Sequence, residues 1–273
     1  MNKLNLEQLE EKSKQLRISI LNMLYNAGSG HTGGSLSAID VLTVLYNNIM
    51  KIDPKNPHWV ERDRFVLSKG HIAPALYSIL ADAGYFDPKE LKTLRKFGSM
   101  LQGHPDMQKT PGLDVSTGSL GQGLSVATGM ALGARSNNDT YRVYCMMGDG
   151  ETQEGQIWEA AMAAGHYKLD NLCAIVDCDR LQIDGKVEDV MTIAPFKDRW
   201  LAFNWNVIKI DGHDFEEIEK GFMKASEFKG KPTILLANTI KGKGVSFMEN
   251  VPGWHGKTPN KEEFEAALSE LQS

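Results

Sequence analysis

The turn Gly148-Asp149-Gly150 lies between an apolar run and a segment with helical periodicity, and this arrangement constrains the fold of the 273-residue chain more than any other feature. The apolar run at residues 141–147 predicts a strand buried on both faces, and residues 154–167 predict a helix. Open α/β sheets bind their ligands beyond the carboxyl ends of their strands. The sequence therefore places Asp149 at a ligand-binding edge of an α/β sheet.

Strand and helix patterns alternate along the rest of the chain. Further apolar runs predict strands at residues 64–67, 172–176, 206–210 and 233–237. Helical patterns occur at residues 4–27, 35–48, 73–83, 120–136, 195–203, 215–228 and 260–273. This alternation predicts a doubly wound parallel sheet with helices on both faces. A hydrophobic content of 41% allows a full core, and we expect a single domain over residues 1–273.

Composition argues against several classes of partner. The formal charge of -5 comes from interspersed acidic and basic residues without a basic stripe, so no nucleic acid is expected. The first residues, Met1 to Glu7, lack the apolar core of a leader, and no uncharged apolar run reaches membrane-spanning length. Cys145, Cys173 and Cys178 are typical of small core residues in a reducing compartment. We therefore expect a soluble, cytoplasmic protein without a membrane partner.

Acidic residues follow two consecutive predicted strands. Asp149 ends the first, and Asp179 follows the second. Their carboxylates, the backbone carbonyl of Leu181, two diphosphate oxygens and a water would complete the octahedron that Mg²⁺ requires, with Mn²⁺ or Ca²⁺ as alternative ions. Gly148 and Gly150 would let the backbone approach the phosphates closely. Taken alone, the tripeptide is more typical of an ordinary Asp-Gly turn.

Four histidines lie in glycine-flanked or proline-flanked turns, namely His31, His71, His104 and His255. Glycine lets the backbone turn an imidazole inward, where it can donate to phosphate or hydroxyl oxygens and exchange protons near neutral pH. Any one of these residues could instead be a solvated or structural histidine. Four in similar surroundings favour a catalytic site. The remaining histidines, interpreted as structural or surface residues, are His58, His166 and His213.

The segment from Gly148 to Gly185 closely resembles the thiamine diphosphate motif of transketolases, and the resemblance extends from about Leu16 to Pro259. It implies the diphosphate-binding domain of the thiamine-diphosphate fold, with thiamine diphosphate and Mg²⁺ as cofactors. The implied reaction transfers a two-carbon ketol (glycolaldehyde) unit from a ketose phosphate to an aldose phosphate, as in the pentose phosphate pathway.

The resemblance also assigns roles to the four histidines. His71 and His255 would contact the cofactor diphosphate region and the reacting centre. His31 and His104 would hold the hydroxyl groups of the donor sugar. All four are therefore candidate catalytic residues.

Other residues match cofactor contacts of the family. Gly118 and Leu120 would lie against the aminopyrimidine and the thiazolium, although Ser119 stands between them where the family usually has proline. Lys241 would approach the phosphates, or else be an ordinary solvated lysine. Glu154 would order the site, or else be an acid favoured by the helix dipole.

Asp179 is the clearest departure from the family, which ordinarily has asparagine at this position. The aspartate adds a negative charge close to Asp149 and to the diphosphate, and it loses the amide donor. We therefore expect weaker cofactor binding than in an asparagine form.

In transketolases the glutamate that protonates the aminopyrimidine, and the arginines that grip the sugar phosphate, belong to a following pyrimidine-binding domain. The sequence has no such segment. We therefore expect a C-terminal partner subunit, with two copies of each chain in a heterotetramer. The alternatives are a 1-deoxyxylulose-5-phosphate synthase fragment, a 2-oxoacid dehydrogenase alpha chain, or a non-catalytic module that binds a nucleotide or thiamine diphosphate. His31 and His104 favour a polyol donor over a 2-oxoacid.

Overall fold

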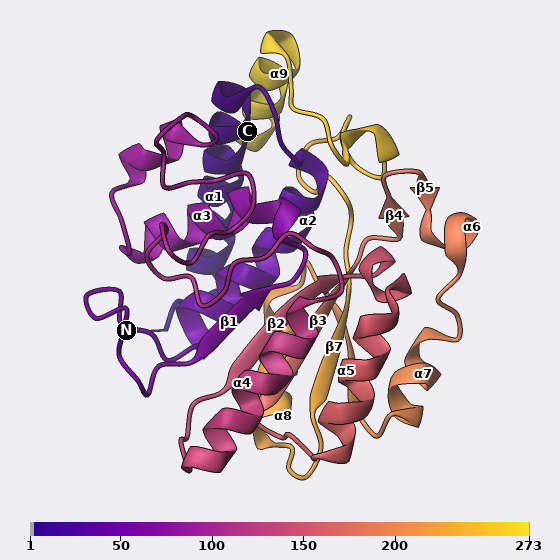
Figure 1. Ribbon diagram of the computed structural model, residues 1–273. Coiled ribbons are helices and arrows are strands. Elements are labelled where there is room, and N and C mark those ends of the chain that lie inside the picture. Colours follow the sequence, from indigo (N-terminus) through magenta and orange to yellow (C-terminus); the bar gives the residue numbers. More distant parts are fainter. Residues whose placement is uncertain (1–2, 273) are drawn as a thin grey trace.

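The computed structural model of the protein describes residues 3–272. Its centre is a parallel sheet with the strand order β1-β2-β3-β7-β6 (Figure 1). The strands are β1 (Arg64–Leu67), β2 (Val143–Gly148), β3 (Leu172–Cys178), β6 (Asn206–Asp211) and β7 (Thr233–Asn238). Met1, Asn2 and Ser273, on which the expectations about a leader and about the domain ends partly rest, lie outside the described residues.

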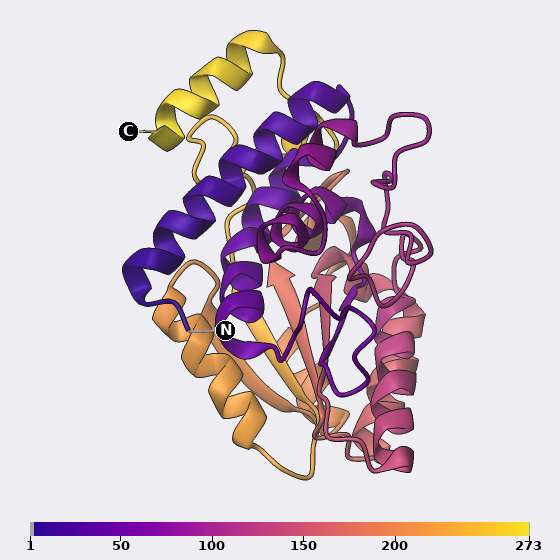
Figure 2. The same ribbon diagram turned by 90° about the vertical axis from the view of Figure 1, so that its left-hand side faces the viewer.

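Helices cover both faces of the sheet, as Figures 1 and 2 show. One face carries α1 (Leu6–Ala27), α2 (Thr32–Val44), α3 (Ala73–Ala83) and α8 (Phe215–Glu227). The other carries α4 (Gly123–Asn137), α5 (Gly155–His166) and α7 (Phe196–Ala202). Strand residues alternate between the two cores, since Met146 packs in the first and Cys145 in the second. The predicted doubly wound parallel sheet is confirmed.

Two helices begin at residues other than those predicted, and glycines with a packing role lie at both helix starts. Helix α2 begins at Thr32, and Gly33 and Gly34 belong to its first turn instead of a preceding loop. A Cβ atom at Gly33 would lie 2.7 Å from Cγ of Lys241, so this glycine allows the close approach of a distant segment. Helix α4 likewise begins at Gly123, later than predicted.

Several short elements escaped the sequence analysis because they contain too few residues to show a period. Between β3 and α7 lie β4 (Leu181–Gln182), β5 (Gly185–Lys186) and α6 (Val187–Met191). The other short helices are η1 (Leu45–Ile49), most of which lies in the helix predicted at residues 35–48, and η2 (Gly70–Ile72), η3 (Pro88–Thr93), η4 (Gly150–Gln153) and η5 (Pro252–Trp254).

The last helix of the described chain packs on the first helix (Figure 2). Helix α1 starts with a capping box formed by Asn5 and Gln8 and is capped at its end by Gly28, whose φ of 63° is left-handed. The last helix, α9 (Lys261–Gln272), packs on α1 through stacked rings of Tyr25 and Phe264, 4.3 Å apart. These contacts return the carboxyl-terminal segment to the amino-terminal helix (Figure 2).

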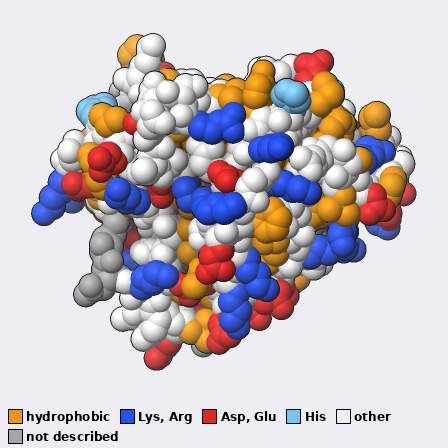
Figure 3. Space-filling model, turned by 90° about the horizontal axis from the view of Figure 1, so that it is seen from below, with side chains coloured by type: hydrophobic (Ala, Val, Ile, Leu, Met, Phe, Trp, Pro, Cys, Tyr) orange, Lys and Arg blue, Asp and Glu red, His pale blue; other side chains and the backbone are white. Residues whose placement is uncertain are grey.

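The surface agrees with the charge pattern of the sequence. On the face seen in Figure 3, Lys and Arg side chains lie among Asp and Glu side chains. Within residues 3–272, no helix has both the length and the apolar character needed to cross a membrane.

Candidate active site

Strands β2 and β3 pair in parallel and bring the two predicted metal ligands to one edge of the sheet. The amide of Asp149 donates to the carbonyl of Asp177 at 3.2 Å. The amide of Arg180 in turn donates to Oδ2 of Asp149 at 2.7 Å. Arg180 has a positive φ of 63°, which folds the turn after β3 back onto the Gly-Asp-Gly turn. The acidic residues predicted from two separate motifs therefore adjoin.

Two buried lysines neutralise two of the aspartates at this edge. Nζ of Lys241 lies 2.6 Å from Oδ2 of Asp179, and both side chains are less than 5% exposed. Lys69 forms an ion pair with Asp177, whose carboxylate also accepts a hydrogen bond from Oγ of Ser37 at 2.6 Å. Lys241, expected near the phosphates, is thus the counter-ion of Asp179.

Asp149 has no such counter-ion among the residues that the structure describes. Its carboxylate accepts only backbone N–H groups, from Gly150 at 2.7 Å and from Arg180. Burial, and then the charge of Asp179, raise the pKa of Asp149 to about 7. When Asp149 is ionised, three aspartates and two lysines leave one buried negative charge without a counter-ion at this edge. A bound cation would remove this deficit.

The protein side chains alone do not form a complete metal centre. Across residues 3–272, no group of three or more His, Cys, Asp and Glu side chains could hold a metal ion. An ion bound to Asp149 and Asp179 would need further oxygens, which a diphosphate and a backbone carbonyl can supply. Leu181 directly follows this turn, and its amide donates to Oδ1 of Asp179 at 3.0 Å. The residues thus fit an ion that binds together with a diphosphate.

Three of the predicted histidines form one cluster. The ring centroids of His31 and His71 lie 5.0 Å apart, those of His71 and His255 lie 5.3 Å apart, and those of His31 and His255 lie 5.7 Å apart. Burial, aided by neighbouring basic groups, lowers the pKa of His31 to about 4, that of His255 to about 3, and that of His71 well below its usual value. Nδ1 of His31 and Nδ1 of His255 are buried without a hydrogen-bond partner. These neutral imidazoles have polar atoms available to a ligand.

His104 lies beside this cluster in a more exposed loop. Its ring lies 3.2 Å from the position that a Cβ atom of Gly118 would take, so the glycine permits the contact. Burial, and then Arg95, lower the pKa of His104. Oγ1 of Thr117, next to Gly118, is buried and lacks a hydrogen-bond partner. The loop expected beneath the cofactor therefore adjoins a predicted substrate contact.

Lys241 connects the aspartates to the histidines. A Cβ atom at Gly34 would have Nε2 of His71 at 3.9 Å and Nζ of Lys241 at 4.0 Å. Beside the aspartates lies a cavity of about 1200 Å³, lined by Asp149, Asp179 and parts of the segment between β4 and α7. The carboxylates are thus linked to His71 through Lys241, whereas none of the four histidines lines this cavity.

Glu151 is a buried residue of this site that sequence reasoning missed. Its carboxylate accepts hydrogen bonds from the amides of Gly121 at 2.9 Å and Gly148 at 3.0 Å, and also from the hydroxyl of Ser68. Burial raises its pKa. Glu151 thus connects the loop predicted to lie beneath the cofactor to the Gly148-Asp149-Gly150 turn. Its position directly after this tripeptide is the sequence signal that could have identified it.

Two other predicted contacts are more exposed. The Glu154 side chain is exposed and lies against Gly121, where an added Cβ atom would approach its Cβ to 2.7 Å. Leu120 is 39% exposed. Roles for both residues stay predictions.

Comparisons with known proteins give the family. The model of the transketolase thiamine diphosphate-binding domain matches residues 9–271. The chain belongs to the transketolase family. It is 46% identical over 268 residues to an apulose-4-phosphate transketolase subunit of Phocaeicola vulgatus, covering 98% of this chain and 95% of that protein. It is 48% identical over 264 residues to a 6-deoxy-6-sulfo-D-fructose transketolase subunit of a Clostridium species, covering 97% and 96%.

The fold agrees with that of a solved transketolase from Campylobacter jejuni. The two superpose with a TM-score of 0.93 at 34% identity, covering 98% of this chain. The match spans 43% of the Campylobacter jejuni chain. The transketolase resemblance, the thiamine-diphosphate fold and thiamine diphosphate as the cofactor of the family are thereby confirmed.

Proposed function

We propose that this chain supplies the diphosphate-binding and metal-binding half of a transketolase active site as a single domain, and that a partner chain supplies the pyrimidine-binding domain. The assembled enzyme transfers a two-carbon ketol unit from a ketose phosphate to an aldose phosphate. Two relatives named as transketolase subunits match this chain over at least 95% of their own length, which supports a divided enzyme.

This proposal rests on the carboxylate of Asp149, which has no counter-ion among the residues that the structure describes. Mg²⁺ would bind the carboxylates of Asp149 and Asp179 and the carbonyl of Leu181, with diphosphate oxygens completing the shell. Mn²⁺ or Ca²⁺ would accept the same oxygen ligands. A Cβ atom at Gly148 would lie 3.5 Å from Lys69, and one at Gly150 would lie 3.2 Å from Gln182, so a side chain at either position would narrow the space that we assign to the phosphates.

The imidazoles bind substrate and move protons. When bound, thiamine diphosphate supplies the carbanion chemistry, and the protein supplies orientation and proton transfer. His71 and His255, neutral and partly buried, would donate to or accept from groups at the reacting centre. His31 and His104 would hold the hydroxyls of the donor. The unpaired Nδ1 atoms of His31 and His255 support these roles.

The remaining parts of the proposal concern the assembly. We propose a heterotetramer with two copies of each chain, in the cytoplasm, acting in the pentose phosphate pathway or a related sugar pathway. The names of the two relatives specify different donors, apulose 4-phosphate and 6-deoxy-6-sulfo-D-fructose. The donor sugar therefore depends on the assembled enzyme. We expect the partner chain to determine it, because that chain would bind the anionic end of the sugar.

Asp149→Ala tests this function. The substitution removes the carboxylate that lacks a counter-ion, so Mg²⁺-dependent thiamine diphosphate binding in the assembled enzyme should be abolished while the fold is retained. Titration calorimetry measures the affinity, and circular dichroism checks the fold. Asp198→Ala is the matched control, because Asp198 is an exposed carboxylate that lines the same cavity. Undiminished cofactor affinity in Asp149→Ala would show that Gly-Asp-Gly is an ordinary turn.

A further inference from the structure

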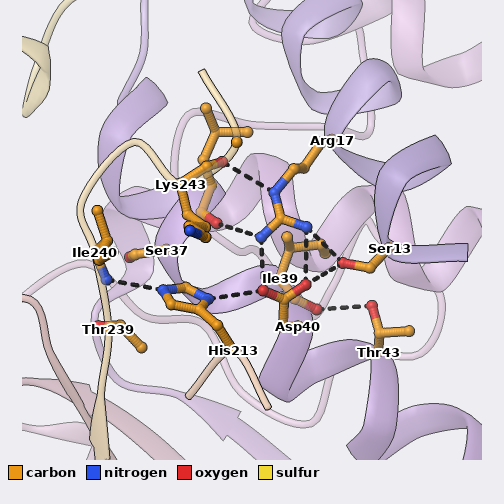
Figure 4. Close-up of polar contacts among 12 residues, drawn as sticks. Ser13, Arg17, Ser37, Ile39, Asp40, Thr43, His213, Thr239, Ile240 and Lys243 are labelled. Carbon is orange, nitrogen blue, oxygen red and sulfur yellow. Dashed lines mark hydrogen bonds and ion pairs between the residues drawn. The ribbon is translucent and has the colours of Figure 1, made fainter. Parts of the chain in front are cut away.

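Figure 4 shows a buried polar network that contains none of the predicted ligands. At its centre is Asp40 of α2, which is 3% exposed. Arg17 of α1 contacts both carboxylate oxygens, with NH1 2.8 Å from Oδ1 and NH2 2.6 Å from Oδ2. Nδ1 of His213, in the turn between β6 and α8, lies 2.8 Å from Oδ2 of Asp40. One carboxylate thus joins three segments that are distant in sequence.

Hydrogen bonding fixes the tautomer of His213. The amide of Ile240 donates to Nε2 of His213 at 2.8 Å, so Nε2 carries no proton. Nδ1 therefore carries the proton and donates it to Asp40. Burial would raise the pKa of Asp40, but Arg17, with the His213 and Ser13 hydrogen bonds, holds it well below its usual value. The acceptor of the His213 proton is an ionised carboxylate, which strengthens the bond.

The network holds the loop after β7 at two points. His213 binds the amide of Ile240, and Nε of Arg17 donates to the carbonyl of Lys243 at 3.0 Å. Lys241 lies between these two points. A third bond, from the amide of Gly242 to the carbonyl of Gly33 at 3.0 Å, fixes the same loop to the first turn of α2. The backbone of Lys241 is thus held on both sides.

We propose that His213 and Arg17, anchored by Asp40, are positioning residues that hold the Lys241 ammonium at Asp179 and at the diphosphate site. A lysine has a flexible four-carbon stem, so the place of its ammonium group depends on how firmly its backbone is fixed. The inference rests on the proposed function, because it assigns to this network a share of cofactor binding. None of its three members contacts the aspartates at the sheet edge in the described structure.

A double-mutant cycle between His213 and Lys241 tests the inference. The measured quantity is the Kd of thiamine diphosphate at fixed Mg²⁺, by calorimetry on the assembled enzyme. We expect His213→Ala to weaken binding about tenfold, the lower end of the range for residues that orient a ligating group. In a Lys241→Met background the same substitution should change the Kd less than twofold, because the group being positioned is absent.

Two further variants separate positioning from general damage. His213→Gln keeps one donor for Asp40 and one acceptor for Ile240, so it should recover most of the affinity, and it keeps the test valid if His213→Ala fails to fold. Asn48→Ala is the matched control, because Asn48 is a buried amide with two hydrogen bonds to the backbone of Leu4. It should lower the melting temperature and leave the Kd unchanged.

The outcomes distinguish the inference from the function on which it rests. Equal effects of His213→Ala with and without Lys241 would overturn the inference alone, as would an unchanged Kd in His213→Ala. Failure of the unsubstituted assembly to bind thiamine diphosphate would overturn the proposed function, and the positioning role with it.

Discussion

Asp179 differs from Asp149 because a lysine neutralises it in the ligand-free protein. Asp179→Asn would leave the buried ammonium of Lys241 without its partner. Removing one member of a buried ion pair costs about 3–5 kcal/mol of stability. The released ammonium would instead attract the diphosphate. We therefore expect Asp179→Asn to lower the melting temperature of the ligand-free chain and to tighten thiamine diphosphate binding at fixed Mg²⁺.

Calorimetry at several Mg²⁺ concentrations measures the affinity, and thermal unfolding without ligands measures the stability. The control is Asp184→Asn, an exposed aspartate in the turn of the β4–β5 hairpin. An unchanged or weaker affinity in Asp179→Asn would show that the aspartate is an adapted metal ligand whose charge, balanced by Lys241, does not hinder the cofactor.

The buried imidazoles give the stability a defined pH dependence. The pKa values of His31 and His255 are about 4 and about 3, whereas imidazoles in the unfolded chain titrate near 6.5. As the pH falls from 6.5 to about 4, the unfolded chain binds protons that these folded histidines do not. Their contribution to the free energy of unfolding is therefore lost through this window. Asp149, with its raised pKa, acts in the opposite direction, so the test compares variants.

His31→Asn and His255→Asn should each lose less stability between pH 7 and pH 5 than the unsubstituted chain loses. Urea unfolding at the two pH values measures this difference. His58→Asn, at an exposed histidine, should behave like the unsubstituted chain. Equal losses in all four proteins would show that the cluster histidines titrate normally.

At the scale of elements, the glycines of α4 differ in the space around them. Apart from their chain neighbours and the nearby backbone of the helix itself, no atom of residues 3–272 lies within 4 Å of the Cβ position of Gly129 or Gly133. At Gly123 a Cβ atom would lie 2.4 Å from the side chain of Ser68. Alanine at a free helical position gains about 0.5–1 kcal/mol by reducing the entropy of the unfolded chain. We expect Gly129→Ala to stabilise the isolated chain by about this amount and Gly123→Ala to destabilise it.

Urea unfolding of the isolated chain measures both changes, and Gly133→Ala should repeat the result of Gly129→Ala. A loss of stability in Gly129→Ala would show that this face of α4 is packed in the protein in solution.

Strands were predictable from the sequence, because a buried parallel strand is a continuous apolar run whatever its neighbours are. β1 was predicted at both ends, and β7 differs from its prediction by one residue, Asn238. The first turn of α2 was not predictable. Gly33 follows a local pattern typical of a loop, and its reason is the side chain of Lys241, more than 200 residues away.

At the scale of the molecule, the sequence predicted only those site residues that lie in short local motifs. Asp149 and the four histidines were found from local patterns, and their proximity is now established, although their roles stay predictions. The ion pair beside Asp149 was not found, because its members, Lys69 and Asp177, lie 108 positions apart and pair only in the fold. His213 was assigned to structure or surface, and its contacts with Asp40 and Ile240 depend on three distant segments.

The proposed division of the active site is a property of the whole molecule that can be tested directly. Residues 9–271 match the thiamine diphosphate-binding domain, while in the family the glutamate that protonates the aminopyrimidine belongs to another domain. The purified chain alone should therefore show no ketol transfer between sugar phosphates, and activity should appear on adding the partner chain. Asp149→Ala chain mixed with the same partner controls for contaminating enzyme, since it should stay inactive. Robust turnover by the unmixed chain would overturn the divided site, because every group needed for catalysis would then have to lie within this one polypeptide.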